Sequence, residues 1–282
     1  MSTVAVLGAG TMGTGIAQCL AQAGWDVVVV DPDAGARERA GAHLADQVRL
    51  ATLLRRVAPG DDVVGRVRWA ADAAALGAAG FVIECVPERV PLKEGVFRVL
   101  DRTCPPDAVL ASATSAIPIA RLAACTARPE LVLGLHFMNP APLKDTVEVV
   151  RGDLTGADTV DRALALLEGM GKRGVVVADG AGFVINRVLQ LAINEAAGVV
   201  LAGTADAAAV DELFESCLGH PMGPLRTADL IGLDNVVDTL RVLAEHTGDA
   251  RFTPSDLLVE LVESGRLGRK SGHGFHEYRN TR

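Results

Sequence analysis

Aromatic side chains are scarce in this chain, and positive charge is in deficit. Only 4% of the 282 residues are Phe, Trp or Tyr while 49% are hydrophobic, so Ala, Val and Leu must fill the core. The formal net charge is −8, and an acidic protein of this kind is poorly suited to general binding of nucleic acid or anionic membranes. The length allows one large domain or two modest ones.

Long apolar runs and paired cysteines are missing as well. No apolar run reaches the ~18 residues that a membrane span needs, and no secretory signal is visible at the start. The five cysteines are odd in number and form no Cys-X-X-Cys pair, which disfavours a disulfide framework and a zinc site. We therefore expect a cytoplasmic protein with reduced thiols and without a metal site.

Short apolar runs alternate with helical stretches over the first 180 residues. This alternation predicts a mostly parallel sheet with helices on both faces. The strands are expected at residues 3–7, 26–30, 67–69, 81–86, 108–111, 131–135, 146–150 and 174–177. After residue 180 the chain reads as helices only, at residues 186–202, 206–218, 227–246 and 254–264, with Thr227 as the cap of the third. The expected domains are therefore α/β at residues 1–180 and all-α at residues 181–282.

A glycine-rich turn follows the first strand and opens the first helix. It reads Gly8-Ala9-Gly10-Thr11-Met12-Gly13, and Asp31 ends the next strand. Such a turn brings backbone N–H groups and a helix N-terminus to a pyrophosphate, and a carboxylate at Asp31 favours the ribose of NAD over that of NADP. We therefore expect a Rossmann-type, doubly wound sheet that binds NAD. FAD is the rival cofactor, and a simple glycine turn with Asp31 as a strand terminator is the alternative without function.

One histidine stands at the end of a buried strand. His136 follows Leu131 to Leu135, a position where a histidine is more often structural. However, ligands of parallel α/β sheets bind at the carboxyl ends of the strands, and Ser115, Glu84 and Glu88 also follow strands. A dehydrogenase needs a base for the hydroxyl proton and a carboxylate behind that base. Glu148 is the candidate carboxylate, because its rival Asp145 lies three residues earlier and so faces the other side of a strand.

Seven motifs together resemble the 3-hydroxyacyl-CoA dehydrogenase family over almost the whole chain. They are GAGTMGTGIA from residue 8, ECVPE, ATS, HFMNP, VEVVRG, GFVINR and LGRKSGHGF. The resemblance implies an NAD-binding domain followed by a helical domain used for dimerisation, and an acyl thioester substrate. It also implies roles for single residues: catalytic base for His136, its partner Glu148, substrate contacts for Ser115 and Asn186, and places near the nicotinamide ribose for Glu88 and Lys93.

Some positions depart from the family pattern. Ala113 stands where an asparagine is usual, His276 stands where an aromatic is common, and Asp46 falls where CoA-using members carry a lysine near the CoA phosphates. An acidic residue there disfavours a phosphate, although four arginines on the same stretch could compensate, namely Arg39, Arg49, Arg55 and Arg56. The alternative substrate is a glyceryl or hydroxymalonyl-type group on an acyl carrier protein, as in the polyketide extender-unit branch of the family.

Two further alternatives concern function as a whole. A dinucleotide-binding protein without catalysis would be expected to lack the base or its partner, but His136, Glu148, Ser115 and Asn186 are all present. A dehydrogenase of a small free acid or of carnitine would need a charged partner for the ion of its substrate, and the sequence identifies none.

Overall fold

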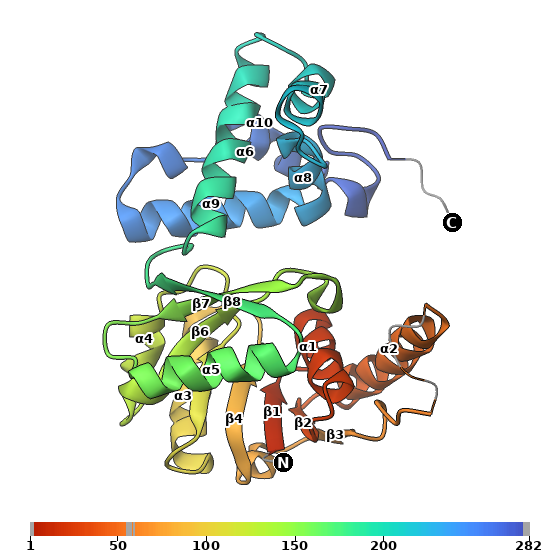
Figure 1. Cartoon of the computed structure of the whole chain (residues 1–282). Helices are drawn as coiled ribbons and strands as arrows, with labels where there is room; N and C mark the ends of the chain where they lie inside the picture. The colour runs from red at the N-terminus through yellow and green to blue at the C-terminus, as the bar shows by residue number, and fades with distance from the viewer. Residues whose placement is uncertain (1–2, 55–57, 59, 279–282) are drawn as a thin grey trace. The chain divides into compact units, whose positions relative to one another are not determined.

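The computed structural model describes residues 3–54, 58 and 60–278. The chain divides into two compact units, Met1–Gly180 and Ala181–Arg282 (Figure 1). Within the described part of the first unit the strands are β1 Thr3–Leu7, β2 Val27–Val30, β3 Val67–Ala70, β4 Ala79–Glu84, β5 Val109–Ser112, β6 Val132–His136, β7 Thr146–Arg151 and β8 Arg173–Ala178. Its helices are α1 Thr11–Gln22, α2 Ala34–Leu53, α3 Val90–Thr103, α4 Ile119–Ala123 and α5 Ala157–Gly169.

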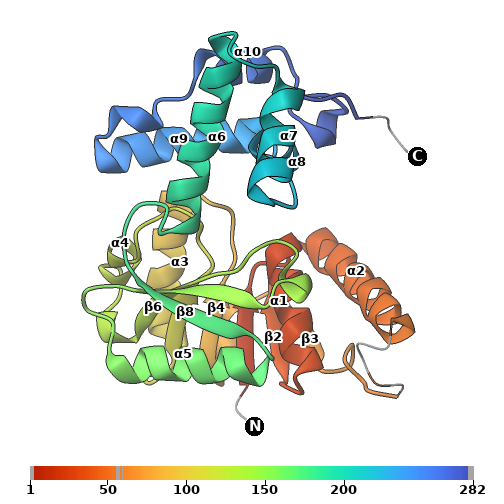
Figure 2. The ribbon, with the colours of Figure 1, turned by 45° about the horizontal axis from the view of Figure 1, so that its top comes forward.

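The eight strands form one sheet in the order β3-β2-β1-β4-β5-β6-β7-β8. Every neighbouring pair is parallel except β6 with β7. The strands β1, β4, β5 and β6 therefore end at the same edge, which is where ligands of doubly wound sheets bind. This confirms the predicted Rossmann-type fold, with a mostly parallel sheet and helices around it (Figure 2).

The main core of this unit lies between the sheet and the helices α1, α2 and α5. Alternate side chains of the strands point into it, such as Val4 and Val6 of β1, and the helices contribute Ile16, Leu44 and Leu167. On the other face, α4 packs closely on β6, because a Cβ at Gly134 would lie 2.8 Å from Ile119 Cδ1. The inner strands of the sheet are thus covered on both faces, as their valine-rich sequences require, whereas the edge strand β8 is largely exposed.

The second unit is helical within its described residues. Its helices are α6 Ile185–Leu201, α7 Ala207–Leu218, α8 Pro224–Ile231, α9 Leu233–Thr247 and α10 Asp256–Glu263. They enclose a separate core to which Ile193, Leu240 and Phe252 contribute, all fully buried. The helical nature of this unit was predicted from its sequence, and it has its own hydrophobic core as a domain should.

The single helix predicted at residues 227–246 is wrong, because two helices occupy this stretch. Gly232 has φ +100° between α8 and α9, a conformation in which an α-helix cannot continue. The cap assigned to Thr227 is wrong too, since α8 begins at Pro224 and Thr227 Oγ1 donates to Gly223 O inside the helix. The buried carboxylate of Asp211 instead accepts from the first free N–H groups of α8.

Candidate active site

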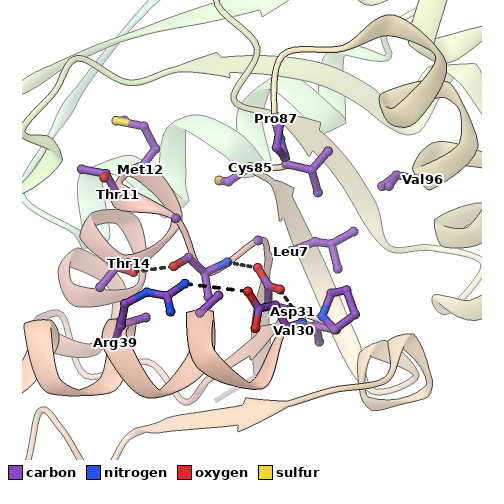
Figure 3. A pocket seen from close by; sticks show the side chains of 18 of the residues that line it. Leu7, Thr11, Met12, Thr14, Val30, Asp31, Arg39, Cys85, Pro87 and Val96 are labelled. Carbon is purple, nitrogen blue, oxygen red and sulfur yellow. Dashed lines mark hydrogen bonds and ion pairs between the residues drawn. The ribbon is translucent and has the colours of Figure 1, made fainter.

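A pocket of about 900 Å³ lies beside the glycine-rich turn (Figure 3). The turn between β1 and α1 lines one side, and the carboxyl end of β2 and the segment after β4 line others. The lining includes the predicted cofactor residues Gly8, Gly10, Thr11, Met12 and Asp31. Its volume is in the range of small-molecule and cofactor sites.

Two glycines of the turn are required by close packing. Gly8 has φ +109°, and a Cβ there would lie 2.8 Å from Cys85 O, on the strand-end segment across the turn. A Cβ at Gly13 would lie 2.0 Å from Gly8 O. At Gly10, in contrast, a Cβ would meet no atom within 4 Å, so the space beside this residue is open. The turn therefore holds α1 tightly against β1 while its middle offers room for a phosphate.

Asp31 closes the end of the pocket beside β2. Its Oδ2 accepts from Ala9 N at 2.8 Å and its Oδ1 from Asp33 N at 2.9 Å (Figure 3). The half-buried carboxylate is thus held at the pocket wall with lone pairs left for the hydroxyls of a ribose. Open turn, helix N-terminus and fixed carboxylate together fit the pyrophosphate and adenosine ribose of NAD.

His136 and Glu148 form a buried pair across β6 and β7. They stand opposite each other in the register of the two antiparallel strands. His136 Nδ1 lies 2.6 Å from Glu148 Oε2, and the two residues are 4% and 5% exposed. Asp145 lies before β7 and is exposed, so the carboxylate behind the histidine is Glu148. A carboxylate at Nδ1 fixes the orientation of the ring and the tautomer of the neutral imidazole.

Ser115 and Glu88 are brought together at the same edge of the sheet. Ser115 follows β5 and its backbone N donates to Glu88 Oε1 at 2.9 Å. Lys93 of α3 lies below them with only 1% of its surface exposed, and its Nζ contacts Glu84 at 2.8 Å and Glu88 at 3.3 Å. Removing one partner of a buried pair such as Lys93–Glu84 typically costs about 3–5 kcal/mol, so the cluster is integral to the fold. Contact of Glu88 and Lys93 with a cofactor stays a prediction.

Asn186 belongs to the second unit, in the first turn of α6, where it is half-buried. Its part in the site stays a prediction. Of the arginines considered as partners for a CoA phosphate, Arg39 lines the pocket near its own ion-pair partner Asp33 at 3.7 Å. Arg49 and Asp46 are exposed on α2, and Arg55 and Arg56 lie outside the described residues.

Sequence reasoning missed Ser112 and Thr114. Both are fully buried, Ser112 Oγ donates to Glu84 Oε2 at 2.6 Å, and Thr114 Oγ1 donates to Glu88 Oε1 at 2.5 Å. The signal was available, since a hydroxyl that ends an otherwise apolar strand needs a buried partner.

Elsewhere in the described residues, no group of three His, Cys, Asp or Glu could hold a metal ion. No helix among them is long and apolar enough to cross a bilayer.

Comparison with known proteins matches both units of the chain to the same family, the 3-hydroxyacyl-CoA dehydrogenases. Residues 3–180 match the family model for the 3-hydroxyacyl-CoA dehydrogenase NAD binding domain, and residues 182–278 match that for the C-terminal domain. A probable 3-hydroxybutyryl-CoA dehydrogenase of Bacillus subtilis is 43% identical over 277 residues, which cover 98% of this chain and 96% of that protein.

Two solved structures are similar throughout. The (S)-3-hydroxybutyryl-CoA dehydrogenase PaaH1 of Ralstonia eutropha aligns with a TM-score of 0.95 at 36% identity, covering 99% of this chain and 100% of the other. FadB2 of Mycobacterium tuberculosis aligns with a TM-score of 0.94 at 38% identity, covering 98% of each chain. With a dinucleotide pocket, a buried His–Glu pair and these matches, the chain belongs to the 3-hydroxyacyl-CoA dehydrogenase family and uses NAD.

Proposed function

We propose that the protein oxidises the 3-hydroxyl group of a short 3-hydroxyacyl-CoA with NAD. The buried pair of His136 and Glu148 carries this proposal. His136 supplies a base at the end of β6, the strand that pairs with β5. The dinucleotide pocket lies at an edge of the same sheet. A protein that only binds a dinucleotide needs no base at this edge of the sheet. A buried His–Glu pair is costly to desolvate, and proton transfer is the function that justifies it.

The residues divide the work of this reaction. When bound, NAD accepts the hydride from the carbon that carries the hydroxyl. His136 takes the hydroxyl proton at Nε2, while Glu148 at Nδ1 fixes the tautomer and stabilises the imidazolium that forms. Ser115 donates a hydrogen bond to the substrate oxygen, and Asn186 contacts the thioester carbonyl. The last two roles come from the family resemblance, supported for Ser115 by its place after β5.

For the group that carries the acyl chain, we propose CoA. The named relatives act on CoA thioesters, with 3-hydroxybutyryl-CoA in the names of several. The alternative of an acyl carrier protein was based on features such as Ala113 and Asp46. The comparisons do not favour it. Asp46 is exposed on α2, so the phosphates of CoA can bind away from this carboxylate.

We also propose that the protein acts as a homodimer in the cytoplasm. Large apolar side chains are exposed on the helices of the second unit, among them Val188 of α6 and Leu213 of α7, 63% and 57% exposed. Exposed apolar side chains of this size favour burial against a second copy. The five cysteines are all free, as expected of a reducing compartment.

The test is the oxidation of NADH on addition of acetoacetyl-CoA, followed by absorbance. We expect turnover, and substituting NADPH should slow it strongly. The same acetoacetyl group on an acyl carrier protein is the comparison substrate. Turnover with the carrier-bound group alone would replace CoA by the carrier, and turnover with neither, in protein shown to bind NADH, would overturn the proposed reaction.

A further inference from the structure

A charge cluster of buried Lys93, buried Glu84 and exposed Glu88 contacts the loop that carries Ser115. Lys93 Nζ donates to both oxygens of Glu84, at 2.8 and 3.0 Å, and to Val86 O at 3.1 Å, and it pairs with Glu88 Oε2 at 3.3 Å. Glu84 is fully buried. One ammonium thus joins the end of β4, through Glu84, to the segment that precedes α3, through Glu88.

Glu88 in turn binds the loop after β5. Its Oε1 accepts from Thr114 Oγ1 at 2.5 Å, from Ser115 N at 2.9 Å and from Ala116 N at 3.1 Å. Thr114 Oγ1 also accepts from Ile117 N at 3.0 Å. A single carboxylate oxygen therefore gathers three donors of the loop, and charge-assisted hydrogen bonds of this kind hold geometry more firmly than neutral ones.

A second path leads from the same ammonium to the same loop. Ser112 Oγ donates to Glu84 Oε2 at 2.6 Å and accepts from Thr114 N at 3.2 Å. The loop before Ser115 is thereby fixed on one side through Glu84 and on the other through Glu88. Ser112 and Thr114 are fully buried.

Lys93 is suited to this task because it is buried among acceptors and stays charged. Burial alone would lower the pKa of Lys93, but Glu84 and Glu88 outweigh burial and hold the pKa above its usual value. The ammonium therefore stays charged. Its side chain is 1% exposed and its three protons have acceptors in the protein.

We propose that this cluster sets the position of Ser115 through Thr114, so that Glu84, Lys93, Ser112 and Thr114 are positioning residues of the active site. The inference rests on the proposed function, since it gives Ser115 the substrate oxygen as its target. A hydroxyl that must meet a reacting oxygen needs its backbone fixed, because a displacement of about 1 Å can cost about 100-fold in rate.

The central variant is Thr114→Val, which keeps the shape of the side chain and removes its hydroxyl. We expect kcat with acetoacetyl-CoA to fall about 10- to 100-fold. Thr114→Ser restores the hydroxyl and should restore most of kcat. Thr126→Val is the matched control, because Thr126 Oγ1 donates only to Ala123 O, after α4. Equal kcat for the Val and Ser variants would overturn the proposal.

A measurement that needs no turnover separates this inference from the proposed reaction. Hydrogen exchange of the amides of Ser115 and Ala116 should speed up in Thr114→Val and stay as in the wild type in Thr114→Ser. Unchanged protection in the Val variant overturns the positioning role even if the enzyme is active. If the wild type does not turn over acetoacetyl-CoA, the proposed reaction is overturned. The exchange measurement still tests whether Thr114 holds the loop that carries Ser115.

Lys93 itself is tested by a pair of variants that allows for misfolding. Lys93→Met leaves two carboxylates without their ammonium and should lose both kcat and thermal stability. The double variant with Glu84→Gln removes one of those charges and should fold better, yet kcat should stay low because Glu88 remains without its ammonium. Full activity of the folded double variant would overturn the role of Lys93.

Discussion

His136 and Glu148 face each other across two antiparallel strands, with Nδ1 and Oε2 separated by 2.6 Å. The reversal of direction between β6 and β7 produces this contact, since it places the carboxylate directly opposite the histidine. In the remainder of the sheet the neighbouring strands run parallel. The exception in the topology thus coincides with the residues to which we assign the proton transfer.

Replacing either member of this pair should damage turnover more than binding. His136→Ala should lower kcat about 100- to 10,000-fold, which is the usual contribution of a general base. Glu148→Gln preserves the shape and a hydrogen bond but removes the charge that stabilises the imidazolium, so a smaller loss of kcat is expected. Steady-state kinetics and NADH fluorescence titration measure the two effects. Asp145→Asn is the control, and wild-type turnover by His136→Ala would contradict the assignment of the base.

Asp31 should decide between the two nicotinamide cofactors. Asp31→Ala removes a carboxylate that repels a 2′-phosphate and leaves Arg39 on the same pocket wall. We expect kcat/KM to fall with NADH and to rise with NADPH, so that the ratio of the two shifts about tenfold or more. Adding Arg39→Ala should then remove the gain with NADPH. An unchanged ratio in the single variant would show that Asp31 does not face the ribose.

The exposed apolar residues of α6 should govern assembly. Val188→Asp places a charge on a surface that we assign to a second copy, and the desolvation of that charge would oppose dimer formation. Light scattering coupled to gel filtration should show a dimer for the wild type and a shift to monomer for the variant. Leu53→Asp is the matched control, since Leu53 is 74% exposed on α2 of the other unit. Monomeric wild-type protein would refute the proposed dimer.

The cysteines should differ sharply in reactivity. Burial raises the pKa of Cys85 strongly and that of Cys104 to about 11, so at pH 8 only about 0.1% of the Cys104 side chain is thiolate. Cys217 is exposed. A thiol-specific dye at pH 8 should therefore label Cys217 quickly and leave the other two unlabelled in the folded protein, as peptide mapping would reveal. Cys85 is half-buried and lines the dinucleotide pocket, so its rapid labelling would contradict the raised pKa of its thiol.

The parts of the site that were predictable from sequence are the local ones. The turn around Gly8 and Gly10 is continuous in the chain, and its strand and helix neighbours identified it. His136 was identified by its place at a strand end, and Glu148 by counting along the next strand. In each case one rule of spacing was enough, because the elements concerned follow one another in the chain.

The parts that escaped prediction depend on tertiary contacts. Glu84 was noted only as a strand-end acid, and its bond to Ser112 joins positions 28 residues apart. The sequence of α8 and α9 has one helical pattern, because a glycine within such a pattern does not by itself mark a break, and only the backbone angles of Gly232 reveal the break. Sequence spacing carries no information on which buried polar groups meet.

The hairpin of β6 and β7 has a further consequence for folding. The base and its carboxylate are only 12 residues apart in the chain, whereas the parallel pairs of the sheet require crossovers through helices. Closing so short a loop costs little chain entropy, so this contact can form before the long-range strand pairing that limits the folding of parallel sheets. The reactive pair is therefore local in the chain, and its contact depends less on long-range strand pairing than the dinucleotide pocket does.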